Sequence, residues 1–105
     1  MKKLFISCPM NGKIFEEIVE VRKEAIKLMK EKFPNEEFEV LKTFVDFEEG
    51  THPLKYMAES IRMLADADIA FFAKGWNEAR GCKIEHECAV AYDIEIVDEY
   101  AENLK

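Results

Sequence analysis

The fold is decided by the stretch IAFFA, residues 69–73, in which every side chain is apolar. A strand that is covered on both faces has this pattern, and such strands are typical of parallel sheets. A second apolar run, residues 4–6, opens the chain and stops at a turn that contains Pro9. We therefore expect both runs to be buried strands.

Apolar residues at helical spacing separate the expected strands. They predict helices from about residue 14 to 33, from 53 to 65 and from the end of loop 74–81 to about residue 92. Further strands are predicted at 38–45 and 94–97, and Asp98 is suited to cap a last helical turn ending at Lys105. Strands that alternate with helices in this way predict a parallel sheet with right-handed crossovers.

Size and composition favour one globular domain, spanning residues 1–105. Hydrophobic residues make up 49% of the chain, which is enough for a packed core. The net charge of -7 argues against a nucleic-acid polymer or an anionic membrane as the partner, because both repel an acidic surface. No apolar run is long enough to span a membrane, and the amino terminus has no secretory pattern.

The three cysteines indicate a reducing compartment. Cys8, Cys82 and Cys88 are an odd number and form no CxxC pair. We therefore expect a cytoplasmic protein.

A ligand site is expected where the strand order reverses. In open parallel sheets, ligands bind beyond the carboxyl ends of the strands at that point. If the first and third strands are neighbours, loops 7–13 and 74–81 meet there. We expect them to hold a nucleoside or nucleotide-like ligand.

Glu85 is the main catalytic candidate. It lies one turn into the third expected helix, where backbone N–H groups and the helix dipole favour an ionised carboxylate. Such a carboxylate can attack a sugar carbon and form a glycosyl ester. The alternative is that Glu85 is one more acid on a helix surface.

Four residues of the loop before Glu85 are candidates for substrate binding. Trp76, next to Gly75, offers an aromatic face to a base, and Arg80, next to Gly81, can meet a phosphate or carboxylate. The alternative is that Trp76 covers the edge of the sheet and Arg80 pairs with a nearby acid.

The loop after the first strand supplies further candidates, namely Ser7, Pro9, Met10 and Gly12. Their segment resembles a tight turn that binds phosphate or sugar, but it lacks the GxGxxG and P-loop patterns. The alternative is a sharp turn between a strand and a helix.

A metal site is a weaker interpretation of the third helix. Cys82 and His86 are four residues apart, on one helical face, but Cys88 points elsewhere and no second metal-binding pair exists. We expect no metal.

Three segments, residues 4–10, 67–76 and 79–86, resemble the nucleoside 2-deoxyribosyltransferase superfamily, and the chain looks like a small branch of it found in bacteria and phages. The resemblance implies a flavodoxin-like or Rossmann-like open sheet of four to five parallel strands, with helices on both faces. It also implies a homo-oligomer, cleavage of the N-glycosidic bond of a deoxynucleoside and no cofactor. Glu85 matches the nucleophile of that family.

The chain departs from the transferases at several positions. Phe5 replaces a Tyr, Cys8 replaces a Gly, and Ser60 stands where those enzymes carry an Asp. A second Asp, shortly before the nucleophile, is replaced at Ala79-Arg80. Those acids position the sugar and manage the proton on the base, so Ser60 becomes a candidate contact and Arg80 indicates a phosphorylated ligand.

Two functions follow from this pattern. The first is an enzyme that cleaves or transfers at the N-glycosidic bond of a nucleoside or nucleotide, for which His86, Glu78 and Asp68 are candidate proton donors. The second is a nucleotide-binding or sensing module that keeps the pocket without turnover.

Overall fold

The computed structural model describes residues 1–10, 13–42 and 50–99. Within these residues the elements follow one another as strand and helix in turn. They are β1 (Lys2–Ser7), α1 (Phe15–Lys32), β2 (Phe38–Val40), α2 (Pro53–Ala65), β3 (Ile69–Phe72), the short 3-10 helix η1 (Trp76–Glu78), α3 (Arg80–Ala91) and β4 (Glu95–Asp98).

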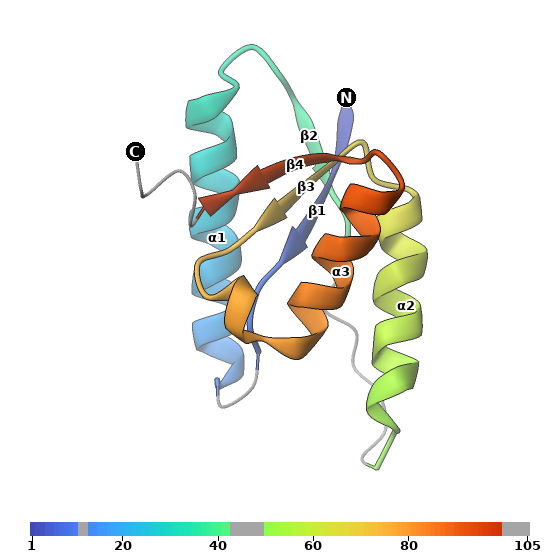
Figure 1. The fold of residues 1–105 in the computed structure, drawn as a ribbon. Helices are drawn as coiled ribbons and strands as arrows, with labels where there is room; N and C mark the ends of the chain where they lie inside the picture. Colours follow the sequence, from blue (N-terminus) through green and yellow to red (C-terminus); the bar gives the residue numbers. More distant parts are fainter. Residues whose placement is uncertain (11–12, 43–49, 100–105) are drawn as a thin grey trace.

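The four strands form one open sheet in the order β2-β1-β3-β4, and all neighbouring strands are parallel. Helix α1 covers one face of this sheet, and α2 and α3 cover the other (Figure 1). The predicted α/β class with helices on both faces is therefore confirmed, with four strands in the sheet.

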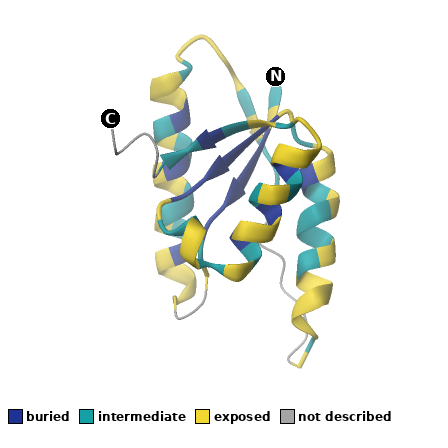
Figure 2. Cartoon of the chain, viewed as in Figure 1, coloured by how far each residue is buried: buried dark blue, intermediate teal, exposed yellow. Residues whose placement is uncertain are grey.

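The core has two layers, one on each face of the sheet. Alternate residues of β1 point to opposite faces, so Leu4 and Ile6 pack toward α1 while Phe5 packs with Leu64 of α2 and Ala89 of α3. All four residues of β3 are buried, as the apolar stretch predicted. Dark blue runs along β3 and most of β1 in Figure 2, and much of the outer surface of the helices is exposed.

The first and third strands are neighbours, with Leu4 opposite Ile69 and Ser7 opposite Phe72. The loops that follow these strands therefore leave the sheet at the same edge. They also touch, because a Cβ atom at Gly75 would lie 3.5 Å from Cγ of Pro9. This confirms that the strand order brings the two candidate loops together.

Two predicted segments differ from the structure or lie outside it. The second strand ends at Val40, and residues 44–45 lie outside the described residues. Asp98 is the last residue of β4, opposite Phe72 in the ladder, and most of the predicted final helical turn lies outside the described residues.

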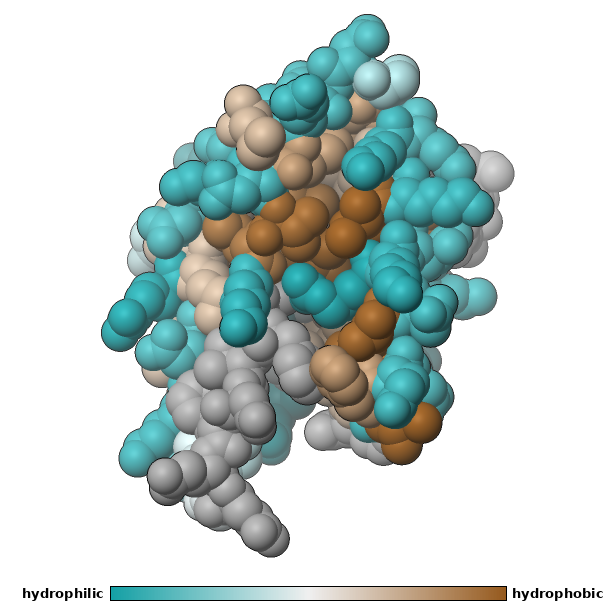
Figure 3. Space-filling view, turned by 180° about the vertical axis from the view of Figure 1, so that it is seen from behind, coloured by the Kyte–Doolittle hydropathy of each residue, from teal (hydrophilic) through white to brown (hydrophobic). Residues whose placement is uncertain are grey.

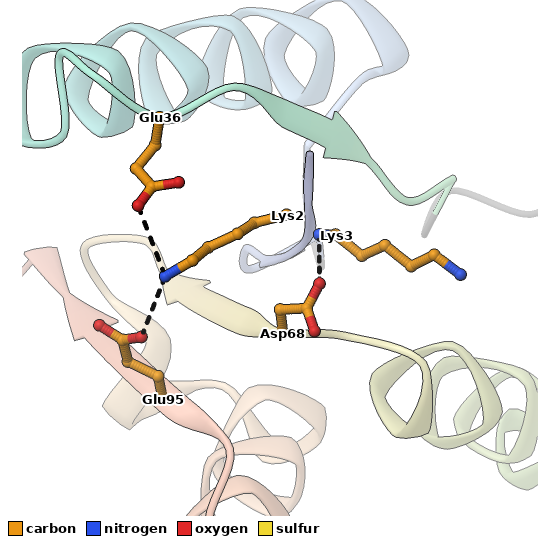
Figure 4. A network of polar contacts seen from close by, with 5 residues as sticks. All are labelled: Lys2, Lys3, Glu36, Asp68 and Glu95. Atoms are coloured by element: carbon orange, nitrogen blue, oxygen red, sulfur yellow. Dashed lines mark hydrogen bonds and ion pairs between the residues drawn. The ribbon is translucent and has the colours of Figure 1, made fainter.

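The opposite, amino-terminal end of the sheet is held by polar contacts (Figure 4). The Lys2 ammonium lies 3.8 Å from a carboxylate oxygen of Glu36 and 4.0 Å from one of Glu95. The Asp68 carboxylate accepts a 2.8 Å hydrogen bond from the backbone N–H of Lys3. Asp68 therefore binds the backbone of β1 at the end of the sheet that lies opposite the candidate loops.

One side of the molecule leaves apolar surface open. Seen from behind, hydrophobic side chains gather in the middle of the molecule with hydrophilic ones around them (Figure 3). Phe38 and Val40 of the edge strand β2 are only partly buried, and both pack against the core. No helix among the described residues is both long and apolar enough to cross a membrane.

Candidate functional site

Glu85 and Ser7 form the centre of the candidate site. The Ser7 hydroxyl, at the carboxyl end of β1, donates a hydrogen bond of 2.6 Å to Oε1 of Glu85 on α3. Both side chains are buried, with Ser7 2% and Glu85 8% exposed. Glu85 is therefore not an exposed acid on a helix surface.

The sheet alternation explains why Ser7 meets this helix. Phe5 packs against α2 and α3, and Ser7, two residues further along the strand, points to the same face. Its hydroxyl comes at the last position of β1, opposite the buried Phe72 of β3. A polar residue at this position can thus reach a carboxyl group on α3.

Burial dominates the electrostatics of Glu85. Loss of solvent raises the pKa of this carboxyl above its ordinary value, and hydrogen bonds from the Ser7 and Ser60 hydroxyls act in the opposite direction. The balance lies on the raised side. The expected effect of the helix start, an easily ionised Glu85, is therefore outweighed by burial.

Ser60 brings a third element to the site. It lies on α2, and its hydroxyl is close enough to the Glu85 carboxyl to lower the pKa of that group, so β1, α2 and α3 all converge there. Gly81 lies where α3 passes α2, because a Cβ atom there would be 3.6 Å from Sδ of Met57. The candidate Ser60 is thus brought together with Ser7 and Glu85.

Two thiols lie close to this centre. Burial raises the pKa of Cys82 to about 11, although its polar contact with Ser7 acts against that rise. Burial also raises the pKa of Cys8, against the opposing charge of Arg22. Both side chains are buried, so at neutral pH they are protonated thiols rather than nucleophiles.

Trp76 belongs to a second group of contacts, which lies on the same face of the sheet but toward β4. Its indole ring stacks on the His86 imidazole, with centroids 3.9 Å apart and planes 7° apart. The indole N–H donates a 2.7 Å hydrogen bond to Asp98, and Phe72 makes edge contacts with both rings. One face of Trp76 is therefore covered, in agreement with the interpretation that it protects the edge of the sheet.

The metal interpretation finds no support in this arrangement. His86 lies 3.7 Å from Asp98 through Nε2, whereas Cys82 points toward Ser7 and Glu85. Within residues 1–10, 13–42 and 50–99, no three His, Cys, Asp or Glu side chains gather as a metal-binding group.

The remaining candidates are spread along the edge of the sheet. Pro9 contacts the position of Gly75, Met10 is 37% exposed, and Arg80 is exposed at the start of α3. Gly12 lies outside the described residues. The structure thus brings Pro9 and Gly75 together but does not bring Arg80 to the Glu85 carboxyl.

Asp98 was not among the residues predicted to lie at the carboxyl end of the sheet. A helix cap was predicted there instead, and the spacing of Trp76 and His86 did not indicate that their rings stack. The one available signal was an acid at the carboxyl end of a predicted strand, which is where polar groups of such sheets gather.

Comparison with known proteins identifies a family. The family model described as "Domain of unknown function (DUF4406)" matches residues 2–98. No curated protein and no solved structure matches the chain. Because the family match extends over every strand and helix described above, the chain belongs to the DUF4406 family.

Proposed function

We propose that this protein cleaves or transfers at the N-glycosidic bond of a (deoxy)nucleoside or nucleotide, with Glu85 as the nucleophile. One observation carries the proposal: a buried carboxyl group, held by a 2.6 Å hydrogen bond from Ser7, lies at the strand-order reversal where such sheets bind ligands. The resemblance of residues 79–86 to the deoxyribosyltransferases points to the same carboxyl.

The reaction needs two displacement steps. The ionised Glu85 carboxylate attacks the anomeric carbon of the sugar, the carbon–nitrogen bond breaks, and its electron pair leaves with the base, which takes up a proton. Water or a second base then attacks the same carbon, loses a proton and releases Glu85 as carboxylate. The hydroxyls of Ser7 and Ser60 hold the carboxylate in place and favour its charged form.

The positions of the three candidate residues reduce the choice of proton donor for the leaving base. Asp68 is bound to the Lys3 backbone at the amino-terminal end of the sheet, so we no longer propose it as the donor. His86 and Glu78 remain candidates, because α3 and η1, which carry them, follow the carboxyl end of β3. The proposed reaction uses no cofactor or metal.

A second candidate function is a nucleotide-binding or sensing module. The observation that favours it is the burial of Glu85, which raises the pKa of the carboxyl. A protonated carboxyl does not attack a sugar, but it can hydrogen-bond to a base or a ribose hydroxyl.

Base release separates the two functions. The protein is incubated with nucleosides, deoxynucleosides and their 5′-monophosphates, with and without an acceptor base, and free base is measured by chromatography. We expect Glu85→Gln to abolish release while ligand-induced thermal shifts persist. The matched control is Glu87→Gln, an exposed acid two positions further along the same helix, which should release base at the wild-type rate.

Each result decides between the functions. Base release that survives Glu85→Gln rules out the nucleophile. Thermal shifts without release from any compound of the panel favour the binding module. Release only from monophosphates would assign a phosphorylated ligand.

The protein is also proposed to act as a homo-oligomer in the cytoplasm. The partly buried apolar side chains of the edge strand β2 support self-association, and the free thiols of Cys8, Cys82 and Cys88 suit a reducing compartment. Light scattering coupled to size exclusion tests the first point, since a monomer at micromolar concentration would contradict it.

A further inference from the structure

Helix α3, which carries Glu85, lacks the local sequence features that usually fix where a helix begins. Ala79 precedes α3 as its N-cap residue without a side-chain hydrogen bond, and the first turn contains no acidic residue. The preceding η1 begins after Gly75, whose φ of 92° is a conformation that side chains disfavour. Local signals that usually fix a helix start are therefore missing here.

Contacts with β4 supply what the local sequence lacks. The Asp98 carboxylate accepts the indole N–H of Trp76 through Oδ1 at 2.7 Å, and its Oδ2 lies 3.7 Å from Nε2 of His86. The two rings are stacked on each other at 3.9 Å. We call Trp76, His86 and Asp98 the Asp98 clamp, because one carboxylate joins η1 and α3 to the sheet.

The Asp98 clamp is built on the paired strands β3 and β4 and is partly shielded from water. Asp98 continues the ladder of β4 opposite Phe72, and Phe72 packs edge-on against both rings of the clamp. The side chains of His86 and Asp98 are 21% and 20% exposed. Both side chains are therefore mostly covered by neighbouring residues.

We propose that Asp98 is a positioning residue for Glu85. Its carboxylate holds η1 and the first turns of α3 against β4, and thereby holds Glu85, the sixth residue of α3, within hydrogen-bond distance of Ser7. Small displacements of a reacting group cost large factors in rate. The kinetic part of this inference rests on the proposed function, and the structural part does not.

The structural part is tested first, without any substrate. Trp76 is the only tryptophan of the chain, so its fluorescence reports on the clamp directly. In Asp98→Ala we expect the emission to move to longer wavelength and the first hydrogen-bonded amides of α3, from Lys83 onward, to exchange hydrogen at least about tenfold faster. Asp98→Asn keeps an acceptor for the indole and should restore most of both signals.

Two further variants distinguish the loss of the Asp98 clamp from a general loss of stability. Glu95→Ala removes another acid of β4, whose 4.0 Å contact with Lys2 lies at the opposite end of the sheet, and it should leave fluorescence and exchange in α3 unchanged. Trp76→Phe keeps an aromatic ring on His86 but loses the N–H donor, so exchange in α3 should rise as in Asp98→Ala.

Kinetics test the link to Glu85. We expect Asp98→Ala to lower kcat of base release by about 10- to 100-fold with a much smaller change in KM, because the carboxyl is misplaced while the ligand site persists. Asp98→Asn should recover most of kcat. Circular dichroism verifies that each variant is folded.

Unchanged exchange in α3 in a folded Asp98→Ala protein would overturn the inference, whatever the activity. Faster exchange with an unchanged kcat would overturn the positioning role. If the wild-type protein releases no base from any compound, the proposed function fails, and the exchange experiment still decides whether the clamp holds α3.

Discussion

The hydroxyl of Ser7 and the carboxyl of Glu85 lie 2.6 Å apart, although 78 positions separate them in the chain. This hydrogen bond crosses from the end of a strand to the second turn of a helix. It also opposes the burial that raises the pKa of Glu85. The pair therefore controls how readily the buried carboxyl ionises.

Ser7→Ala should make Glu85 harder to ionise. Removal of the hydroxyl takes away a hydrogen bond that favours the carboxylate, so the pKa of Glu85 rises further. We expect base release to fall by about 10- to 100-fold and the acidic limb of its pH profile to move to higher pH, since hydrogen bonds to charged groups are strong. Ser7→Thr, which keeps the hydroxyl, is the control, and a pH profile that does not move in Ser7→Ala would contradict this role.

Glu85→Gln should stabilise the protein more at neutral than at acidic pH. Because the pKa of Glu85 is raised in the folded state, that state holds the proton more tightly than the unfolded chain, and this contribution is lost as pH rises above about 4.5. Glutamine does not ionise, so Tm of the variant minus Tm of the wild type should grow between about pH 4 and pH 7. A difference that is constant over this range would show that Glu85 is not buried in solution.

The two glycines Gly75 and Gly81 should respond differently to alanine, because Gly75 precedes η1 and Gly81 lies in α3. Gly75 has a φ of 92°, so Gly75→Ala should lower the free energy of unfolding by about 1–2 kcal/mol. Gly81 lies inside α3, and a Cβ there makes an ordinary contact with Met57, so Gly81→Ala should be neutral or stabilising by up to about 1 kcal/mol. Urea unfolding measures both, and equal effects would contradict the difference in backbone conformation.

The three thiols should differ in reactivity. Cys8 and Cys82 are buried, and the pKa of Cys82 is about 11, whereas Cys88 is only partly buried. A thiol reagent at about pH 8 should therefore modify Cys88 first and the other two only after unfolding, because the thiolate is the reactive form. Cys88→Ser should remove the fast phase, and rapid labelling of Cys82 in the folded protein would contradict its burial.

The strands and helices were largely predictable because their signals are local. Residues 69–73 are apolar throughout and form the buried strand β3, and the helical spacing of residues 53–65 matches α2. The second strand was predicted too long, since β2 stops at Val40. Its pairing with β1 ends where Val40 lies opposite Leu4, although β1 continues to Ser7, and periodicity carries no information on pairing.

The candidate site was only partly predictable. Glu85 was chosen from the third predicted helix and Ser7 from the loop after the first strand, and their contact depends on β1 and β3 being neighbours. For Trp76 the sequence left two interpretations open, a face for a base or a cover for the sheet edge, and in the structure His86 covers one face of the ring. The role of Asp98 was not visible, because nothing near it in sequence indicates that it meets Trp76.

By itself, the sequence determined an α/β protein with parallel strands, an apolar central strand and chemically unusual loops after the first and third strands. Only the tertiary structure decided that Glu85 is buried against Ser7 and Ser60, and that Trp76 and His86 share the carboxylate of Asp98. The reason is physical: hydrophobic periodicity acts over a few residues, whereas the protonation and orientation of a side chain depend on groups that folding brings from distant parts of the chain.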